Sequence, residues 1–480
     1  MIVAREDGSG RRDEFVFRDG ETSSYLGSTP ESTTQFLVTA PEGTCKMRLS
    51  IIGSGYVGTT VAACFADLGH DVVNVDIDEE IVDAINDGRA SIHEAGLDEL
   101  VAEHAGPDGT GRLRATTDYG AVLDTDVTFL CLPTPQNDDG SIDLSIMEAG
   151  ATQLGETLAD ATEWHTVVVK STVVPGTTED AITPSLEDAS GAAAGEAFGV
   201  GMNPEFLREG TAVNDFLNPD KLVLGADDER ALGDMHDVFD PLVSRADAPV
   251  VETDTRTAEM IKYANNGFLA AKISLINDIG NICKEFGIDA YEVADAIGLD
   301  DRIGEQFLRS GVGWGGSCFP KDTSAIISAA EREGYEPPML NAAVEVNDGQ
   351  PGRLVGLLAN HLDLGGARVA VLGLAFKPGT DDVRNSRAIP VIEQLQARGA
   401  TVTAYDPVAT ENAKASLDDV TYADSAAAAL EDADGAVVVT DWDEFAALDR
   451  EFDAMATPIV VDGRRIIERR DGITYEGLTW

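Results

Sequence analysis

A glycine-rich turn near residue 53 constrains the fold of this chain more than any other feature of its sequence. A short apolar run over residues 48–52 ends directly in Gly53-Ser54-Gly55-Tyr56-Val57-Gly58, and a helical pattern follows. The next apolar run, VVNVD, ends in Asp76, eighteen residues beyond Gly58. A strand, a tight glycine turn, a helix and a second strand form a βαβ unit, which predicts a parallel sheet covered on both faces.

The same rhythm returns along the chain. Further strand-like runs occur at VTFLCLP and TVVVKST, and a second set runs from ARVAVLGLAFKPGTDD through TVTAYDP and GAVVVT to PIVVDGRR. Between the two sets, residues 254–287 have apolar positions at three- and four-residue spacing and predict one long helix. The predicted fold class is α/β, with two Rossmann-like doubly wound domains joined by a long central helix in a helical dimerisation domain. The expected divisions are a disordered extension over 1–46 and domains over 47–250, 251–350 and 351–480.

The chain is strongly acidic, with 86 acidic against 34 basic residues and a formal net charge of −52. Such self-repulsion weakens a compact state unless salt screens it, so this composition indicates adaptation to molar salt. The alternative is an acidic protein that docks on basic partners, but that predicts a clustered acidic tail, whereas these acids are spread along the chain. Nucleic acid is not expected as a partner, because a negative surface repels phosphate.

Cysteine usage and hydropathy indicate the cellular compartment of the protein. The five cysteines are scattered and contain no CxxC pair, which predicts a reducing environment with neither a disulfide framework nor a metal site. The chain contains neither a signal-peptide pattern nor a long apolar run. We therefore expect a soluble, cytoplasmic protein with no membrane partner.

The chemistry of the glycine turn favours a dinucleotide. Gly53, Gly55 and Gly58 let the backbone approach a pyrophosphate at a helix N-terminus. Asp76 can accept hydrogen bonds from a ribose 2′-hydroxyl and would repel a 2′-phosphate, which favours NAD over NADP. The alternative is a glycine turn with a purely structural role.

A second cluster, Gly315-Gly316-Ser317-Cys318-Phe319-Pro320-Lys321-Asp322, has the composition of a nucleophile site. Pro320 suits the first turn of a helix, which would leave Cys318 near a positive dipole end that favours the thiolate. Lys321 adds positive charge, and Asp322 offers a base or hydrogen-bond acceptor. The alternative is a buried structural cysteine.

Three further groups are candidates. Lys262 and Asn266 lie four residues apart on the predicted long helix and should share one face. The chain has only nine lysines, so a retained Lys262 suggests a compact charge for an oxyanion, although a lysine in such a place often only reaches solvent.

The segment from Asn203 to Glu209 resembles an Asn cap, a first-turn proline and two acids one helical turn apart, which could equally be simple dipole compensation. Thr172 follows a strand at the predicted ligand-bearing edge of the sheet and could hold a water molecule, or be an ordinary polar strand end.

Taken together, these segments resemble the UDP-glucose/GDP-mannose dehydrogenase family. The ordered motifs GSGYVG, CLPTP, KSTVVPGT, NPEFLREG, AEMIKYANN, GGSCFPKD, FKPGTDDVRNS and DGRR carry the resemblance, which runs from Met47 nearly to residue 480. The resemblance implies oxidation of a sugar C6 alcohol to a carboxylate with two NAD per turnover, through thiohemiacetal and thioester intermediates on a cysteine. It also implies an NAD-binding domain over 47–250 and a UDP-sugar-binding domain over 351–480.

Residues carry over from the family position by position. The catalytic matches are Cys318 as nucleophile, Lys262 and Asn266 at the oxyanion, Asp322 and Thr172 at the water, and Glu205 and Glu209 as acids whose pKa burial is expected to raise. The cofactor matches are Gly53, Gly55, Tyr56, Val57, Gly58, Asp76, Thr134, Thr172, Glu209, Lys321 and Arg384. The substrate matches are Glu205, Phe206, Leu207, Arg208, Glu209, Lys262, Asn266, Arg302, Gly315, Phe376, Lys377 and Arg464.

The resemblance also sets expectations for partners. Arg302 matches an arginine that reaches the neighbouring subunit's site, which implies a homodimer or larger homo-oligomer. UDP-glucose is the favoured substrate, with GDP-mannose or another nucleotide sugar as the alternative. A reading from a different class is an inactive nucleotide-sugar sensor, but such a protein would be free to lose the cysteine, the lysine and the acid that this chain retains.

Overall fold

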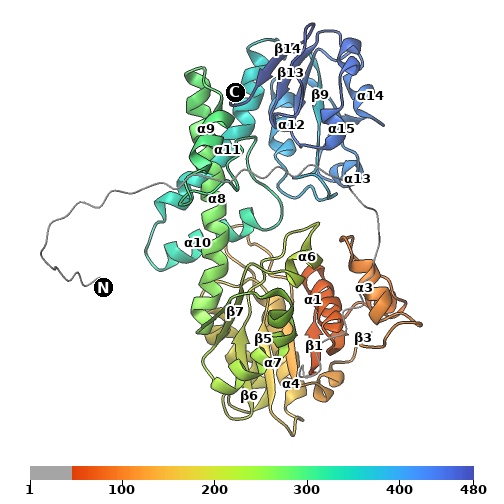
Figure 1. Cartoon of the computed structure of the whole chain (residues 1–480), viewed down its shortest axis with the longest axis vertical. Helices are drawn as coiled ribbons and strands as arrows, with labels where there is room; N and C mark the ends of the chain where they lie inside the picture. Colours follow the sequence, from red (N-terminus) through yellow and green to blue (C-terminus); the bar gives the residue numbers. More distant parts are fainter. Residues whose placement is uncertain (1–45) are drawn as a thin grey trace, which may run out of the picture. The chain divides into compact units, whose positions relative to one another are not determined.

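The computed structural model describes residues 46–480. The extension expected over residues 1–46 therefore lies outside the described residues, apart from Lys46. No helix within residues 46–480 is long and apolar enough to cross a membrane. Two parallel sheets and the helices around them account for most of this part of the chain (Figure 1).

The first sheet has eight strands in the order β3-β2-β1-β4-β5-β6-β7-β8, and only the β6–β7 pair is antiparallel. The strand order reverses direction between β1 and β4, which is where open α/β sheets bind ligands. The strands are β1 Arg48–Ile52, β2 Asp71–Val75, β3 Leu113–Thr116, β4 Val127–Leu130, β5 His165–Val169, β6 Phe198–Met202, β7 Leu222–Ala226 and β8 Val250–Thr253.

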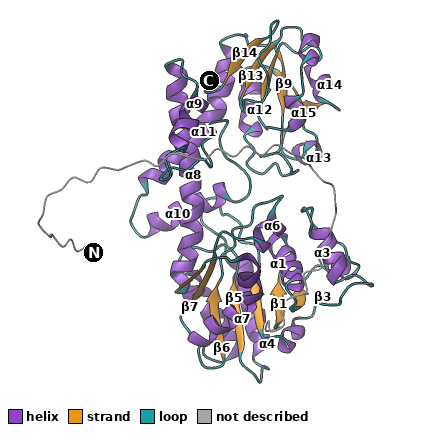
Figure 2. Ribbon diagram, in the orientation of Figure 1, coloured by secondary structure: helices purple, strands orange, loops and turns teal. Residues whose placement is uncertain are grey.

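Helices cover both faces of this sheet, as Figure 2 shows for its strands and their flanking helices. Leu49 and Ile51 of β1 pack into a core shared with α1 and α7, whereas Ile52 packs into a second core shared with α4 and α5. Side chains on both faces of this strand are thus buried, which explains why its sequence is mostly apolar rather than alternating with charged residues. The helices are α1 Tyr56–Asp67, α2 Glu79–Asn86, α3 Leu97–His104, α4 Ser145–Leu158, α5 Thr183–Ser190, α6 Ala212–Leu217 and α7 Glu229–Ala246.

The glycine turn joins β1 to α1 by close backbone contact. Gly53 has φ +97°, a conformation that favours glycine. A Cβ added at Gly58 would lie 1.9 Å from the Gly53 carbonyl oxygen, so the first turn of α1 packs directly on the end of β1. Gly55, between them, has nothing within 4 Å of an added Cβ and leaves open space in front of the helix.

The long helix α8, Thr255–Glu285, follows the first sheet as predicted. Asp254 caps it by accepting a hydrogen bond from the Thr257 backbone N–H at 2.6 Å. Helix α8 packs against α10, Phe319–Arg332, and α11, Pro338–Ala359, and Figure 1 shows these helices side by side. The short helix α9, Ala290–Gly298, follows α8 along the chain.

The second sheet has six parallel strands in the order β11-β10-β9-β12-β13-β14, the Rossmann order repeated. The predicted α/β class, with two doubly wound sheets and a long helix between them in sequence, is confirmed. The strands of the second sheet are β9 Arg368–Leu372, β10 Thr401–Tyr405, β11 Val420–Tyr422, β12 Gly435–Val438, β13 Ile459–Asp462 and β14 Thr474–Gly477. Its helices are α12 Ala388–Ala397, α13 Thr410–Ala413, α14 Ala426–Leu430 and α15 Asp443–Ala446.

Two of the expected domain boundaries do not coincide with the ends of elements. Strand β8 continues to Thr253, beyond residue 250, and helix α11 continues to Ala359, beyond residue 350. A helix is cooperative along its hydrogen-bonded length, and α11 crosses the expected division at residue 350. The three-part division itself stays a prediction.

Exchange of Gly58 for alanine tests the packing of the glycine turn. Gly58→Ala is expected to lower the free energy of unfolding by about 3 kcal/mol, because the methyl group overpacks the turn. Gly233→Ala in α7 is the matched control: nothing lies within 4 Å of its added Cβ, and the exchange should stabilise by up to about 1 kcal/mol. Denaturant unfolding in molar KCl measures both, and unchanged stability of Gly58→Ala would contradict the packing described.

Candidate active site

The carboxyl ends of β1 and β2 form the predicted cofactor edge. The Asp76 side chain accepts hydrogen bonds from the backbone N–H groups of Ser54, at 2.5 Å, and Asp78, at 3.0 Å. The carboxylate is therefore held beside the glycine turn, at the place where a ribose hydroxyl would meet it. The open space at Gly55 and the N-terminus of α1 fit the pyrophosphate of a dinucleotide.

Tyr56 and Val57 begin α1 and have different surroundings. Val57 packs on the core beneath the turn. The Tyr56 hydroxyl donates to the Glu94 carboxylate and accepts from the Gly210 backbone N–H at 3.2 Å. Tyr56 thus joins the start of α1 to the segment that carries Glu209.

Two threonines meet across the ends of neighbouring strands. The Thr134 hydroxyl, after β4, donates to the Thr172 carbonyl oxygen, after β5, at 3.0 Å. Ser171 supports the same junction by donating to the Leu132 carbonyl oxygen at 2.7 Å. Thr134 and Thr172 are therefore neighbours on the edge of the sheet that also carries the glycine turn.

Cys318 immediately precedes α10, and its loop contacts the loop after β9. The Gly316 backbone N–H donates to the Arg384 carbonyl oxygen at 3.0 Å, and Asn385 donates back to the Gly316 carbonyl oxygen at 3.1 Å. An added Cβ at Gly315 would lie 2.1 Å from the Asn385 carbonyl oxygen, and one at Gly316 would lie 2.7 Å from the Phe376 ring. These contacts bring Gly315, Phe376 and Arg384 to the cysteine loop.

A buried ion pair lies beside the cysteine. Lys262 of α8 donates to Glu205 at 2.9 Å, and the two residues are 3% and 8% exposed. Burial alone would lower the pKa of Lys262, but Glu205, Asp322 and Cys318 raise it above its ordinary value. Lys262 is therefore a fixed cation whose field reaches the Cys318 sulfur.

Asn266 and Asp322 form the second half of this cluster. Asn266, one turn beyond Lys262 on α8, donates its amide to Asp322 of α10 at 2.7 Å. Lys321 donates to the other oxygen of Asp322, also at 2.7 Å. Asp322 is 2% exposed, so the helix that follows the cysteine and the long helix α8 are joined through this carboxylate.

The predicted thiolate at Cys318 is not supported. Cys318 is exposed to solvent, yet the protein atoms around it desolvate the sulfur, and this burial raises the pKa of its thiol. Glu205 raises that pKa further and Lys262 lowers it, so the thiol is balanced between opposite charges. The expectation considered the helix end and Lys321 but missed Glu205, which tertiary folding brings in.

The two predicted acids differ in their protonation. Burial alone would raise the pKa of Glu205, but Lys262 outweighs it and holds that pKa below its ordinary value, which corrects the prediction for this residue. Burial does raise the pKa of Glu209, in the predicted direction. The Glu209 side chain accepts a hydrogen bond from Thr380, and its carbonyl oxygen accepts one from Lys377.

The segment that carries these acids is a loop, whereas the sequence predicted a helix start. Asn203 does not cap a helix: it accepts from Lys170 at 2.7 Å and donates to the Val223 carbonyl oxygen at 2.8 Å. The Glu205 side chain accepts from the Leu207 backbone N–H at 2.6 Å, which closes a local turn. Side-chain hydrogen bonds thus replace helical ones here.

Other predicted residues lie around this group or apart from it. The Phe206 ring lies 5.5 Å from the Lys262 ammonium, whereas Arg208 pairs with Asp215 at 2.6 Å. Arg464 follows β13 and donates to the Val439 carbonyl oxygen at 2.6 Å. Arg302 is not brought to the cluster, and its exposed side chain pairs with Asp300 at 2.6 Å.

Sequence reasoning missed several contacts. Glu94 accepts from the Gly210 and Ala212 backbone N–H groups, both at 2.8 Å, and Lys170 is buried with its pKa lowered by burial to about 8. Nothing local marks Glu94, because Tyr56 lies 38 residues before it and its other two partners are more than a hundred residues away. The scarcity of lysine was a usable signal for Lys170.

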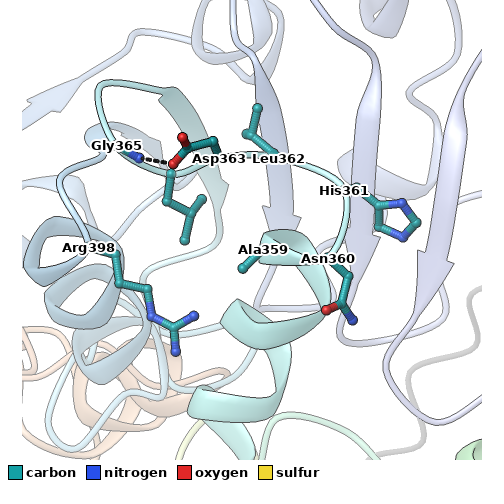
Figure 3. A pocket seen from close by; sticks show the side chains of 8 residues that line it. Ala359, Asn360, His361, Leu362, Asp363, Gly365 and Arg398 are labelled. Carbon is teal, nitrogen blue, oxygen red and sulfur yellow. Dashed lines mark hydrogen bonds between the residues drawn. The ribbon is translucent and has the colours of Figure 1, made fainter.

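A surface pocket elsewhere contains none of the predicted site residues. It lies between the end of α11 and the start of β9, with His361 and Arg398 at its rim (Figure 3). His361 is already paired with Glu476 at 2.8 Å. This pocket is therefore separate from the predicted site residues.

Alkylation of Cys318 tests the charge balance at the thiol. Because the pKa of the Cys318 thiol is raised, the reactive thiolate is a small fraction at neutral pH, and this fraction grows with rising pH. Glu205→Gln is expected to lower the pKa of Cys318 and speed alkylation at neutral pH, whereas Lys262→Met is expected to slow it; each pKa unit alters the rate about tenfold. Iodoacetamide labelling of the Cys318 peptide, followed by mass spectrometry over a pH series, measures this, and equal rates in the two variants would refute the balance.

Comparison with protein-family models places three consecutive segments in one family. Residues 47–243 match the NAD binding domain of the UDP-glucose/GDP-mannose dehydrogenase family, residues 256–349 its central domain and residues 370–469 its UDP binding domain. The family predicted from the motifs, and NAD as its cofactor, are thereby confirmed.

Individual relatives extend along nearly the whole chain. UDP-glucose 6-dehydrogenase AglM of Haloferax volcanii is 65% identical over 433 residues, covering 90% of this chain and 100% of the relative. A UDP-glucose 6-dehydrogenase of Rhizobium meliloti is 43% identical, covering 90% and 98%. The solved structure of a UDP-glucose dehydrogenase from Pyrobaculum islandicum superposes with a TM-score of 0.85 at 43% identity, covering 92% of this chain and 100% of that one.

Proposed function

Because the chain belongs to the UDP-glucose/GDP-mannose dehydrogenase family, we propose that it oxidises the C6 alcohol of UDP-glucose to the carboxylate of UDP-glucuronate. The observation that carries the proposal is a cysteine beside two buried polar pairs, Lys262–Glu205 and Asn266–Asp322. The 65% identity to a relative named UDP-glucose 6-dehydrogenase supports the choice of substrate.

NAD supplies the oxidising power, and residues of this chain form its binding site. NAD, when bound, takes up a hydride in each of the two oxidations. The glycine turn from Gly53 to Gly58 would hold its pyrophosphate and Asp76 its ribose. Thr134, Thr172 and Arg384 are proposed as further contacts, because they lie at the same edge or on the loop that contacts the cysteine loop.

Cys318 divides the oxidation into two easier parts. After the C6 alcohol has lost a hydride and its hydroxyl proton, the sulfur bonds to the aldehyde carbon, the thiol proton passes to the carbonyl oxygen, and the thiohemiacetal retains the reactive aldehyde. Loss of a second hydride from that carbon, and of the hydroxyl proton, leaves a thioester. Water then bonds to the thioester carbon, the carbon–sulfur bond breaks, and the sulfur leaves with the electron pair.

The two buried pairs are proposed to stabilise the charges that develop in these steps. Lys262 and Asn266 donate hydrogen bonds toward the oxyanion that develops when sulfur or water adds to C6. Thr172 and Asp322 are proposed to hold the water, and Asp322 to accept its proton. Glu205 keeps Lys262 charged, and Glu209, whose pKa is raised by burial, is the acid better suited to exchange a proton.

The remaining proposed substrate contacts include residues in loops of the second sheet. Phe376 and Lys377 lie in the loop after β9, which contacts the cysteine loop, and Lys377 donates to the Glu209 carbonyl oxygen. An ammonium at this junction suits the diphosphate of a nucleotide sugar. Arg464 and the Glu205–Glu209 segment are proposed to complete the site.

A homodimer is proposed from the exposed face of α8. Phe268, Leu275 and Ile282 recur every seven residues and are 71%, 57% and 52% exposed, so a line of apolar side chains follows one face of the helix. A second copy of the chain would cover this line and place Arg302 near the neighbouring site. A cytoplasmic location stays a prediction.

Sedimentation in molar KCl tests the dimer. Phe268→Glu is expected to shift the protein to monomers, because a carboxylate would be buried in an apolar interface. Val408→Glu is the control, since Val408 is also exposed, at 52%, but lies outside α8. A monomeric unaltered protein, or a dimer retained in Phe268→Glu, would refute this interface.

A panel of sugar nucleotides tests the reaction and its alternatives. With NAD in molar KCl, the unaltered protein is expected to oxidise UDP-glucose with formation of about two NADH per uronate, and Cys318→Ser to lose uronate formation by at least about a thousandfold while still binding NAD. Oxidation of GDP-mannose alone would replace the substrate. Binding without oxidation would favour the sensor, and full activity of Cys318→Ser would overturn the covalent route.

A further inference from the structure

Glu259 is a fully buried carboxylate without an assigned role. It lies on α8, one turn before Lys262, and is 0% exposed. One oxygen accepts from the Gly176 backbone N–H at 2.5 Å, and the other accepts from the Thr178 backbone N–H at 2.8 Å and the Thr178 hydroxyl at 2.6 Å. All three donors belong to one short segment of the chain.

Glu259 is held by hydrogen bonds and forms no ion pair within residues 46–480. The strongest influence on the pKa of Glu259 is burial, which raises it, and the next are the hydrogen bonds from Thr178 and Gly176; the remaining one is the like charge of Glu179. None of these influences is a cation, although the Arg256 guanidinium lies next to Gly176. A buried carboxylate is costly to desolvate, and here the hydrogen bonds from Gly176 and Thr178 offset that cost; beside an apolar side chain these donors would lack an acceptor.

The segment that Glu259 binds is the far end of the loop that carries Thr172. The loop leaves β5, passes through Thr172 and ends where a π-helical turn begins, Thr178–Ile182. Thr134 and Ser171 bind its near end to the loop after β4. Glu259 binds its far end to α8, so the loop is held at both ends.

Helix α8 carries three of the buried polar side chains of this region. Glu259, Lys262 and Asn266 occupy successive turns of one helix and are all buried. Their partners come from three other places: the Thr178 segment, the Glu205 loop and Asp322 of α10. The position of the Thr172 loop relative to the oxyanion groups is therefore set through Glu259.

We infer that Glu259 is a positioning residue, which holds the Thr172 loop against α8 at the distance that thioester hydrolysis requires. The inference rests on the proposed function. In that step the water oxygen bonds to the thioester carbon, its proton passes to Asp322, and the sulfur leaves as thiolate. Displacing Thr172 misplaces the water, which the two hydride losses do not use; a shift of the NAD contact proposed for Thr172 would instead raise the KM for NAD.

Glu259→Gln is the direct test. It keeps the size and one acceptor oxygen, but it turns an amide donor toward backbone N–H groups. We expect kcat for UDP-glucose oxidation to fall by about tenfold to a hundredfold, as for a modest misplacement of a reacting group, with a nearly unchanged KM. A larger fraction of enzyme quenched in acid during turnover should carry a covalent adduct on Cys318, measured by intact mass and peptide mapping.

Arg256→Gln is the matched control at the same junction. Arg256 joins α8 to the same turn from outside, through an exposed ion pair with Glu179 at 2.7 Å, and such pairs contribute little. We expect near-normal kcat and no added adduct. Thr178→Val, which removes only the hydroxyl donor, should shift kcat and adduct in the same direction as Glu259→Gln but less, and replaces it if that variant does not fold.

The possible outcomes separate cleanly. A kcat per titrated active site equal to that of the unaltered protein, with only lower thermal stability, would show a merely structural role and overturn the inference. A fall in kcat without added adduct, or equal adduct in Arg256→Gln, would also overturn it. Failure of the proposed function itself appears elsewhere, as the absence of any Cys318 adduct in the unaltered protein and retained activity in Cys318→Ser.

Discussion

The buried ion pair between Lys262 and Glu205 is the interaction on which the arrangement of the site depends. Both side chains are withdrawn from water, and each is the main charged group that opposes the effect of burial on the pKa of the other. The pair joins α8 to the loop after β6, at the carboxyl edge of the first sheet. With α8 held there, Asn266 meets Asp322 one turn further along, and the cysteine that precedes α10 is brought into the same field.

The cysteine loop is supported from a third direction. Its glycines pack so closely on the loop after β9 that no side chain fits, and backbone hydrogen bonds join the two loops. The thiol is consequently reached by solvent and yet surrounded by charges of both signs. Raised by burial and by Glu205, and lowered by Lys262, the pKa of Cys318 depends on the positions of groups from separate elements. A nucleophile placed in this way responds to any change in the charge pair beside it.

Much of the fold was predictable because its signals are local. The long helix follows from apolar spacing and from Asp254, whose side chain caps it. The glycine turn follows from the contact of Gly58 with the end of β1, which only a residue without a Cβ allows. The family motifs likewise mark Cys318, Lys262, Asn266 and Asp322, which the structure brings together.

The failures have one physical origin. The family resemblance predicted a raised pKa for Glu205 because it places this carboxyl in a buried active site, but the decisive partner, Lys262, is 57 residues away. The sequence predicted an Asn cap at Asn203, whose side chain instead bonds to Lys170 and Val223 in neighbouring strands. Glu259 drew no attention, because an acid in a helix looks ordinary until its three donors converge on it.

The sequence by itself therefore determined the order of strands and helices, the glycine turn and the types of residue available for chemistry, because each is set by short-range sterics and periodicity. Only the tertiary structure decided which charges face one another and which protons are held. Electrostatic free energies in a protein depend on burial and on distances of a few ångströms between groups far apart in the chain.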